Sequence, residues 1–282
     1  MTALAGIDHA LVGVVDLEAA RALWTRLGFT LSPRGRHKGW GTGNYCAMFG
    51  ADYVELLGIV DPAGFDNGLQ AMLAERGPGL LGFAVAARDA GLAAAELAKG
   101  GLAHETKRLS RLIELPEGDV EPSFALAMPQ AAYPGGMKPF VCAHETRNLV
   151  WRPEWTRHPN TALRIASLTF VADDPLALRD PFEAILGLGS ATATDDTLAV
   201  RWGAGAPVLI VKPDDFALTH PCMGPDEPVR QGFAGMTIAV ADVDAARAAL
   251  KAGGFVYEKD LAGAAHMAPG DAGGLALSFE AG

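Results

Sequence analysis

The sequence predicts an α+β fold in which four β-α-β-β-β modules pair into two domains. Residues 16–22 return in similar form as residues 242–248, and each copy follows an apolar run and precedes a Gly-Phe pair. Both copies have the order strand, capping aspartate, amphipathic helix and glycine. The chain has 282 residues, half of them hydrophobic, which is enough for two domains of ordinary size.

The first module shows each expected element in turn. An apolar run over residues 6–15 predicts the first strand, and Asp16 is a suitable helix N-cap. Gly28 suits the left-handed position that ends a helix. The apolar stripe of the helix consists of Ala20, Leu23, Trp24 and Leu27. Three short β-rich stretches follow, at residues 31–36, 45–50 and 52–60.

Two weaker copies lie between these repeats, around Asp89 and around the pair Asp173 and Asp174. Modules therefore begin near residues 7, 80, 165 and 234, and an insertion around residues 116–136 lengthens the second. One module leaves a sheet face bare, so modules should pair. A polar, proline-containing stretch at residues 147–168 separates the pairs. We expect domains at 1–158 and 159–282.

Composition excludes several classes of function. Lys and Arg number 23 against 33 Asp and Glu, so the net charge of −10 disfavours binding to nucleic acid. No apolar run reaches the roughly 20 residues of a membrane span, and Asp8 interrupts a secretion signal. The three cysteines suggest neither a disulfide framework nor a thiolate zinc site. We expect a cytoplasmic protein with a small-molecule substrate and no membrane or nucleic-acid partner; a homodimer stays open.

Paired modules with a histidine on the first strand and a glutamate on the last resemble the vicinal oxygen chelate superfamily. This superfamily includes glyoxalase I, extradiol dioxygenases and bleomycin-resistance proteins. The sequence is most similar to glyoxalase-like domain proteins over residues 7–29, 35–44, 53–59 and 150–160. The resemblance implies a divalent metal in the cleft between paired modules. It also implies ligands from the first and last strand of a module.

Carried onto this sequence, the ligand positions are His9 and Glu55. Side chains alternate along a strand, so His9 can face the cleft while Ala10 and Val12 pack beneath the helix. Glu55 stands among apolar neighbours, where burial is costly unless the carboxylate meets a metal or another cation. The alternative is a strand-edge histidine and a hydrogen-bonded acid without a metal.

The repeat shows which other modules could supply ligands. Shifts of 73 and 226 residues place Gly82 and Gly235 at the position of His9, and the third module has Ala166 or Ser167 there. The second domain therefore looks degenerate. A third ligand is then expected from residues 139–145, where His144 is favoured and a one-residue slip in register would exchange it for Glu145. Two histidines and one carboxylate suit Fe, Mn, Zn or Ni as divalent ions.

The glycine-rich stretch at residues 35–44 contains His37, which we interpret as a catalytic proton carrier. His37 is also an alternative third ligand in place of His144. Trp40, Asn44 and Tyr53 are expected to bind substrate. The alternative is that Thr42 and Asn44 only fix a turn. Elsewhere, we expect His158 to pack the two domains together, and His220 and His266 to lie in turn-rich polar stretches.

The predicted function is that of a divalent-metal-dependent enzyme acting on a small, oxygen-rich substrate, as an isomerase, lyase or dioxygenase. The alternative is a non-catalytic protein that binds a small molecule or sequesters an antibiotic. Such a protein needs an aromatic cleft but no metal.

Overall fold

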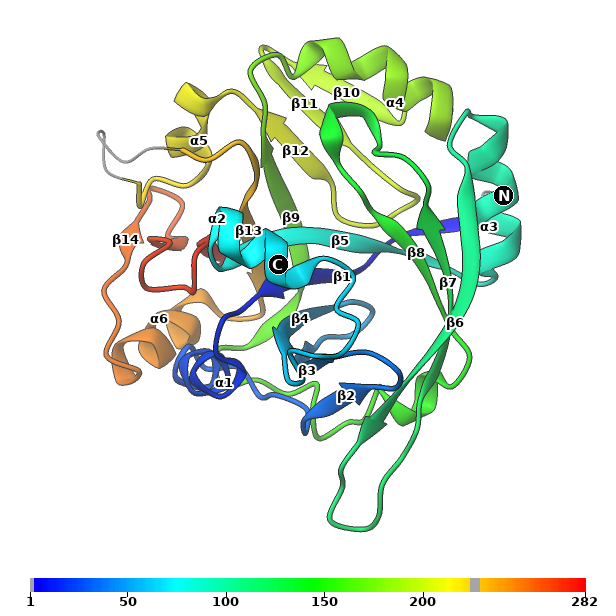
Figure 1. Cartoon of the computed structure of the whole chain (residues 1–282). Coiled ribbons are helices and arrows are strands. Elements are labelled where there is room, and N and C mark those ends of the chain that lie inside the picture. Colours follow the sequence, from blue (N-terminus) through cyan, green and yellow to red (C-terminus); the bar gives the residue numbers. More distant parts are fainter. Residues whose placement is uncertain (1–2, 224–228) are drawn as a thin grey trace.

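The computed structural model describes residues 3–223 and 229–282 and confirms the α+β fold of paired modules (Figure 1). The first two modules form a closed barrel with the strand order β1-β4-β3-β2-β6-β7-β8-β5. The last two form an open sheet with the order β10-β11-β12-β9-β13-β16-β15-β14. None of the described helices combines the length and hydropathy that a bilayer span requires.

The barrel modules have nearly the predicted order. The first comprises β1 (Leu4–Gly13), α1 (Leu17–Arg26), β2 (Gly35–His37), β3 (Thr42–Met48) and β4 (Tyr53–Ile59). The connecting helix α2 (Leu69–Arg76) follows. The second comprises β5 (Gly79–Ala87), α3 (Ala90–Lys99), β6 (His104–Ile113), β7 (Ser123–Pro129) and β8 (Phe140–His144). Short 3₁₀ turns lie at Pro134–Gly136 and Arg147–Leu149.

The open sheet repeats this order. The third module comprises β9 (Ala162–Val171), a 3₁₀ turn (Leu176–Leu178), α4 (Arg179–Leu186), β10 (Ala191–Thr194), β11 (Thr197–Val200) and β12 (Val208–Val211). The connecting helix is α5 (Pro213–Thr219). The fourth comprises β13 (Gly232–Val240), α6 (Val243–Ala252), β14 (Glu258–Lys259), β15 (Ala265–Met267) and β16 (Ala276–Ala281). In every module the first strand pairs in parallel with the last.

The capping aspartates explain where the helices begin. Asp16 accepts hydrogen bonds from the backbone N–H groups of Glu18 and Ala19, and Asp242 caps α6 in the same way. Asp89 caps α3 through one such bond. The third module differs because a 3₁₀ turn precedes its helix, and α4 has no side-chain cap.

Aromatic side chains join the two sheets. The ring of Phe83 on β5 lies 5.1 Å from that of Trp202 and 5.7 Å from that of Phe233, measured between centroids. The ring of His158, in the connection between the sheets, accepts a hydrogen bond from Thr30 N and donates one to Met48 O. His158 therefore packs this connection onto the first module. The domain boundary after residue 158 falls between β8 and β9 and stays a prediction.

Two histidines of the open sheet differ from expectation. His220, directly after α5, is completely buried and contacts the hydroxyls of Thr169 and Ser278. His266 lies in β15, also buried, and its Nδ1 is 2.8 Å from the same Ser278 hydroxyl. The prediction of a turn-rich stretch was wrong for His266, which lies in a strand, whereas His220 directly precedes a turn. Both imidazoles are buried because hydroxyls satisfy them inside the core.

Asp52 joins the sheets and makes stability depend on pH. Its Oδ1 accepts a hydrogen bond from Ile165 N at 3.0 Å, and burial raises the pKa of this carboxyl from 3.8 to about 7. Between these values the folded protein holds a proton that the unfolded chain releases, so the folded state binds more protons. We therefore expect the free energy of unfolding contributed by Asp52 to fall as pH rises from about 4 to about 7.

Denaturant titrations across this pH range check the expectation. The stability difference between the unmodified protein and Asp52→Asn should fall by up to about 1.4 kcal/mol per pH unit, because other buried groups, such as His37 and His220, titrate in both proteins and cancel. Asp119→Asn, at an exposed position, is the matched control and should show the pH dependence of the unmodified protein. An identical pH dependence in Asp52→Asn and the unmodified protein would contradict the assignment.

Candidate functional site

The barrel encloses a cavity of about 610 Å³. Its polar lining includes His9, His37, Thr42, Glu55 and Arg111. Its apolar lining includes Leu11, Leu57, Phe83, Leu109, Phe124, Leu126 and Phe140. Strands of both modules contribute to these walls, so the cavity lies where the modules pair.

A β-bulge in β1 places two neighbouring side chains inside the barrel. Ile7 pairs with Val85 and His9 pairs with Ala84, so Asp8 is an extra residue that has no paired residue on β5. Asp8 and His9 are 2% and 3% exposed, and His9 Nδ1 donates to Asp8 Oδ1 at 2.7 Å. Simple alternation along the strand would have separated these side chains.

The same register shift occurs in the first strand of every module. The extra residues that match Asp8 are Leu81, Ala166 and Ala234. The residues that match His9 are therefore Gly82, Ser167 and Gly235. The two predicted glycines hold these positions, and Ser167 rather than Ala166 holds the third. None of these three side chains can replace the imidazole of His9 as a ligand.

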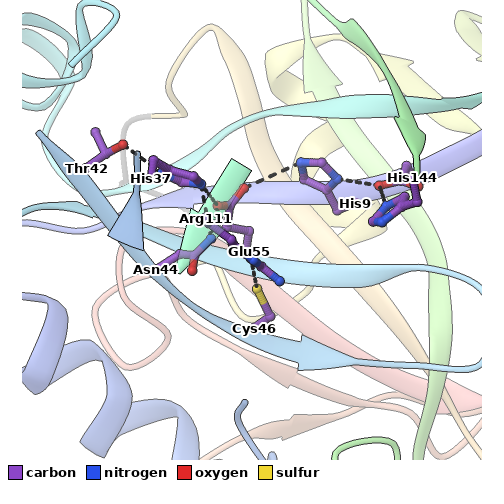
Figure 2. A network of polar contacts seen from close by, with 9 residues as sticks. His9, His37, Thr42, Asn44, Cys46, Glu55, Arg111 and His144 are labelled. Carbon is purple, nitrogen blue, oxygen red and sulfur yellow. Dashed lines mark hydrogen bonds and ion pairs between the residues drawn. The ribbon is translucent and has the colours of Figure 1, made fainter. Parts of the chain in front are cut away.

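Glu55 comes from β4, where it pairs with Leu11 of β1. One carboxylate oxygen, Oε2, lies 3.5 Å from His9 Nε2, and the other, Oε1, lies 3.6 Å from His37 Nε2. Burial alone would raise the pKa of Glu55, but His9, His37 and other polar neighbours hold it below its ordinary value. The side chain is therefore an ionised carboxylate between two imidazoles (Figure 2).

The glycine-rich stretch places His37 beside Glu55. His37 Nδ1 lies 2.8 Å from Thr42 Oγ1, and burial lowers the pKa of the imidazole to about 4. Asn44 Nδ2 donates to Glu55 Oε1 at 2.5 Å and lies 3.4 Å from His37 Nε2. One amide group thus faces lone pairs of both side chains. Thr42 and Asn44 therefore contact the two ring nitrogens of His37 and orient its imidazole.

His144 lies on the far side of Asp8. Its Nε2 donates to Asp8 Oδ1 at 3.1 Å, and the same oxygen accepts a hydrogen bond from His9 Nδ1. The strand register also explains this placement. Ala84 pairs with Phe140 as Leu11 pairs with Glu55, so Phe140 rather than His144 occupies the position matching Glu55. The structure places Glu55 between His9 and His37, whereas His144 meets His9 only at the shared Asp8 oxygen.

The other predicted contacts line the cavity. The Tyr53 ring stacks on the His9 ring with centroids 4.5 Å apart. Trp40 packs edge-to-face on Phe65 at 5.0 Å, and the Lys107 ammonium lies 4.9 Å from the Trp40 ring centroid. Both aromatic rings are therefore available to a bound molecule.

Comparison with known proteins assigns the family. The family model described as the glyoxalase-like domain matches residues 7–186, which is more than half of the chain. The chain belongs to the glyoxalase-like domain family. The matched segment includes the barrel except for the first three residues of β1, and so all of the cavity residues named above. A search of curated proteins found no match to this glyoxalase-like protein.

Solved structures share its fold at low sequence identity. A hypothetical protein from Staphylococcus aureus has a TM-score of 0.66 and 13% identity, with 98% of each chain covered. A mutant of 4-hydroxymandelate synthase from Streptomyces coelicolor has a TM-score of 0.59 and 10% identity, over 99% of this chain and 92% of that one. A xylose isomerase-like TIM barrel/4-hydroxyphenylpyruvate dioxygenase fusion protein has a TM-score of 0.57 and 14% identity. This last match covers 99% of the glyoxalase-like protein and 48% of the fusion chain.

Sequence reasoning missed three polar residues of the glyoxalase-like protein. Asp8 was hidden by the bulge, although it directly precedes His9. Cys142 is buried, and its sulfur lies within 4.8 Å of donor atoms of Asp8 and His9. Burial raises the pKa of this thiol well above its ordinary value, which disfavours the thiolate that metals bind. Arg111 became a neighbour of His37 only through the pairing of β2 with β6.

Proposed function

We propose that this glyoxalase-like protein is a divalent-metal-dependent enzyme that acts on a small, oxygen-rich substrate, as an isomerase, lyase or dioxygenase. The observation that supports this most is the position of the Glu55 carboxylate in a cavity, with one oxygen facing His9 Nε2 and the other facing His37 Nε2. Two imidazoles and one carboxylate form a ligand set suited to Fe(II), Mn(II), Zn(II) or Ni(II).

The tautomer of His9 fits this role. Its Nδ1 faces Asp8, so the tautomer in which Nδ1 donates to that carboxylate has its lone pair on Nε2, directed toward Glu55. A carboxylate behind a ligating histidine is a common arrangement at metal sites, because it fixes the ring and strengthens the donor. Asn44 Nδ2 lies near both His37 Nε2 and Glu55 Oε1, so one amide group serves both acceptor atoms. A cation at this place would interact with the same two atoms.

We propose His9 and Glu55 as two ligands and a histidine as the third. His37 is favoured because its Nε2 faces Glu55 directly, whereas His144 faces Asp8. If His144 supplies the third donor instead, His37 is free for proton transfer. Its lowered pKa keeps the imidazole neutral at pH 7, ready to accept a proton at Nε2.

A bound divalent ion would act as a Lewis acid on neighbouring substrate oxygens. The chain's own residues orient the substrate and limit the access of water. Tyr53 stacks on one side of the His9 ring, and Phe140 packs against it edge-on at 5.7 Å. Trp40 and Lys107 lie among the cavity residues that a substrate would contact.

The second candidate function is binding without catalysis. The aromatic lining from Trp40, Tyr53 and Phe140 favours it, because flat rings suit a small organic ligand. Such a protein would bind its ligand equally well before and after treatment with a chelator.

Elemental analysis of protein purified without chelator separates the two functions. We expect about one divalent ion per chain, lost in Glu55→Gln, because an amide is a weaker donor than a carboxylate. Glu145→Gln is the matched control, since Glu145 follows β8 and pairs with the exposed Arg108. Substoichiometric metal in the unmodified protein, or metal retained by Glu55→Gln, would favour the binding protein.

The identity of the metal then directs the search for a reaction. If iron is present, oxygen uptake is measured with a panel of catechols. If zinc, nickel or manganese is present, α-hydroxy carbonyl compounds and glutathione hemithioacetals are tested first. The Glu55→Gln variant should lack any turnover found, and Glu145→Gln should keep it.

A further inference from the structure

Arg111 is a buried cation in the cavity wall that forms no ion pair with a carboxylate among the described residues, although Glu55 is near enough to interact with it electrostatically. It lies on β6 opposite His37 of β2, so the two side chains are cross-strand neighbours. The residue is 2% exposed, and Nη1 donates to Cys46 Sγ at 3.1 Å (Figure 2). Its Nε and Nη2 have no hydrogen-bond partner among the described residues.

Leaving two guanidinium donors unpaired in a protein interior is costly. A neutral thiol accepts a hydrogen bond weakly, so Cys46 does not explain why a charged side chain stands there. The guanidinium also presents a planar set of donors that matches a carboxylate. These donors belong to a residue that lines the cavity, beside the candidate metal ligand His37.

The balance of buried charges also favours an anionic ligand. Asp8 and Glu55 carry one negative charge each and Arg111 one positive charge, all of them buried. A divalent ion would leave this cluster with one net positive charge. An uncompensated buried charge is unfavourable, and a monoanionic ligand would neutralise it.

We propose that the site takes a small monoanion whose carboxylate is held by Arg111, while a neighbouring oxygen faces His9 and Glu55. The proposal rests on the metal-dependent function above and specifies its substrate class. The apolar wall residues, which include Leu109, Phe124 and Leu126, lie on the same strands β6 and β7 and would contact the rest of the molecule. The substrate is therefore an acid with a compact apolar body.

Mandelate and mandelamide test the proposal because they share a skeleton and differ in charge. Calorimetric titration of Mn(II)-loaded protein should show mandelate binding about tenfold to a hundredfold more tightly than mandelamide. Arg111→Met should remove this preference, and Arg111→Lys should keep part of it. Arg108→Met is the matched control, because Arg108 lies on the same strand with an 82% exposed side chain.

Thermal unfolding and metal content of each variant accompany the titrations. If Arg111→Met does not fold, the reduced preference of Arg111→Lys decides the question. Equal binding of the two probes by metal-loaded protein, or an unchanged preference in both Arg111 variants, would overturn the anion site while leaving the metal-dependent function intact. Absence of metal contradicts that function separately. A preference lost in Arg111→Met but seen without metal supports the anion site alone.

Discussion

Replacing His37 by alanine should lower the affinity for Mn(II) or Zn(II) at least about a hundredfold. This is more than is usually lost with a side chain that only hydrogen-bonds to a metal ligand. The reason is that His37 Nε2 lies 3.6 Å from Glu55 Oε1 inside the cavity. His144→Ala, the matched control, should cost tenfold or less, because His144 reaches the site only through Asp8. Competition with a chelator of known affinity measures both values.

The reverse result would assign different roles. If His144→Ala loses the metal and His37→Ala keeps it, His144 is the third ligand and His37 is left for proton transfer. The activity of His37→Ala would then fall without a change in metal content. If both substitutions lower the metal affinity only slightly and equally, neither His37 nor His144 is the third ligand.

Gly235→Ala should destabilise the protein by about 3 kcal/mol, at the upper end of the usual cost of overpacking. A Cβ at this position would lie 2.2 Å from His220 Nε2 and within 2.8 Å of two further ring atoms. The ring cannot move aside without loss, because Thr169 and Ser278 contact its two nitrogens at 2.9 and 3.0 Å. His220 thus fills the space above the position that matches His9.

A double-mutant cycle tests this explanation by urea unfolding. His220→Ala should itself be destabilising, but Gly235→Ala should cost less than about 1 kcal/mol when added to it, because the clash is gone. Gly270→Ala is the control, since a Cβ there meets nothing within 4 Å. Additive effects of the two substitutions would show that His220 is not the cause.

The modules were predictable because their signals are local. A capping aspartate, an apolar stripe and a terminal glycine lie within a dozen residues, so the order of strand and helix follows from Asp16 and Asp242 and their neighbours. The positions of Gly82 and Gly235 were also correct, because a constant sequence shift matches the strand register of the modules.

The details of the site depend on pairing between distant segments. A bulge has no side-chain signature, so nothing in the sequence shows that Asp8 and His9 share one face. The pairing of β2 with β6 closes the barrel and brings Arg111 to His37, which are 74 positions apart by number. The placement of Phe140, and not His144, opposite Ala84 likewise needs the register of β5 and β8.

The recurring bulge has a consequence for how chemistry can be added to this architecture. Each first strand presents two successive side chains where a regular strand would present one, and this backbone exists in all four modules. Only β1 uses the pair for an acid and an imidazole. The fold thus has four equivalent bulge positions, and only the one in β1 carries an acid and an imidazole. At the other three, new donor atoms would require substituted side chains and the removal of neighbouring bulk, but no insertion into the chain.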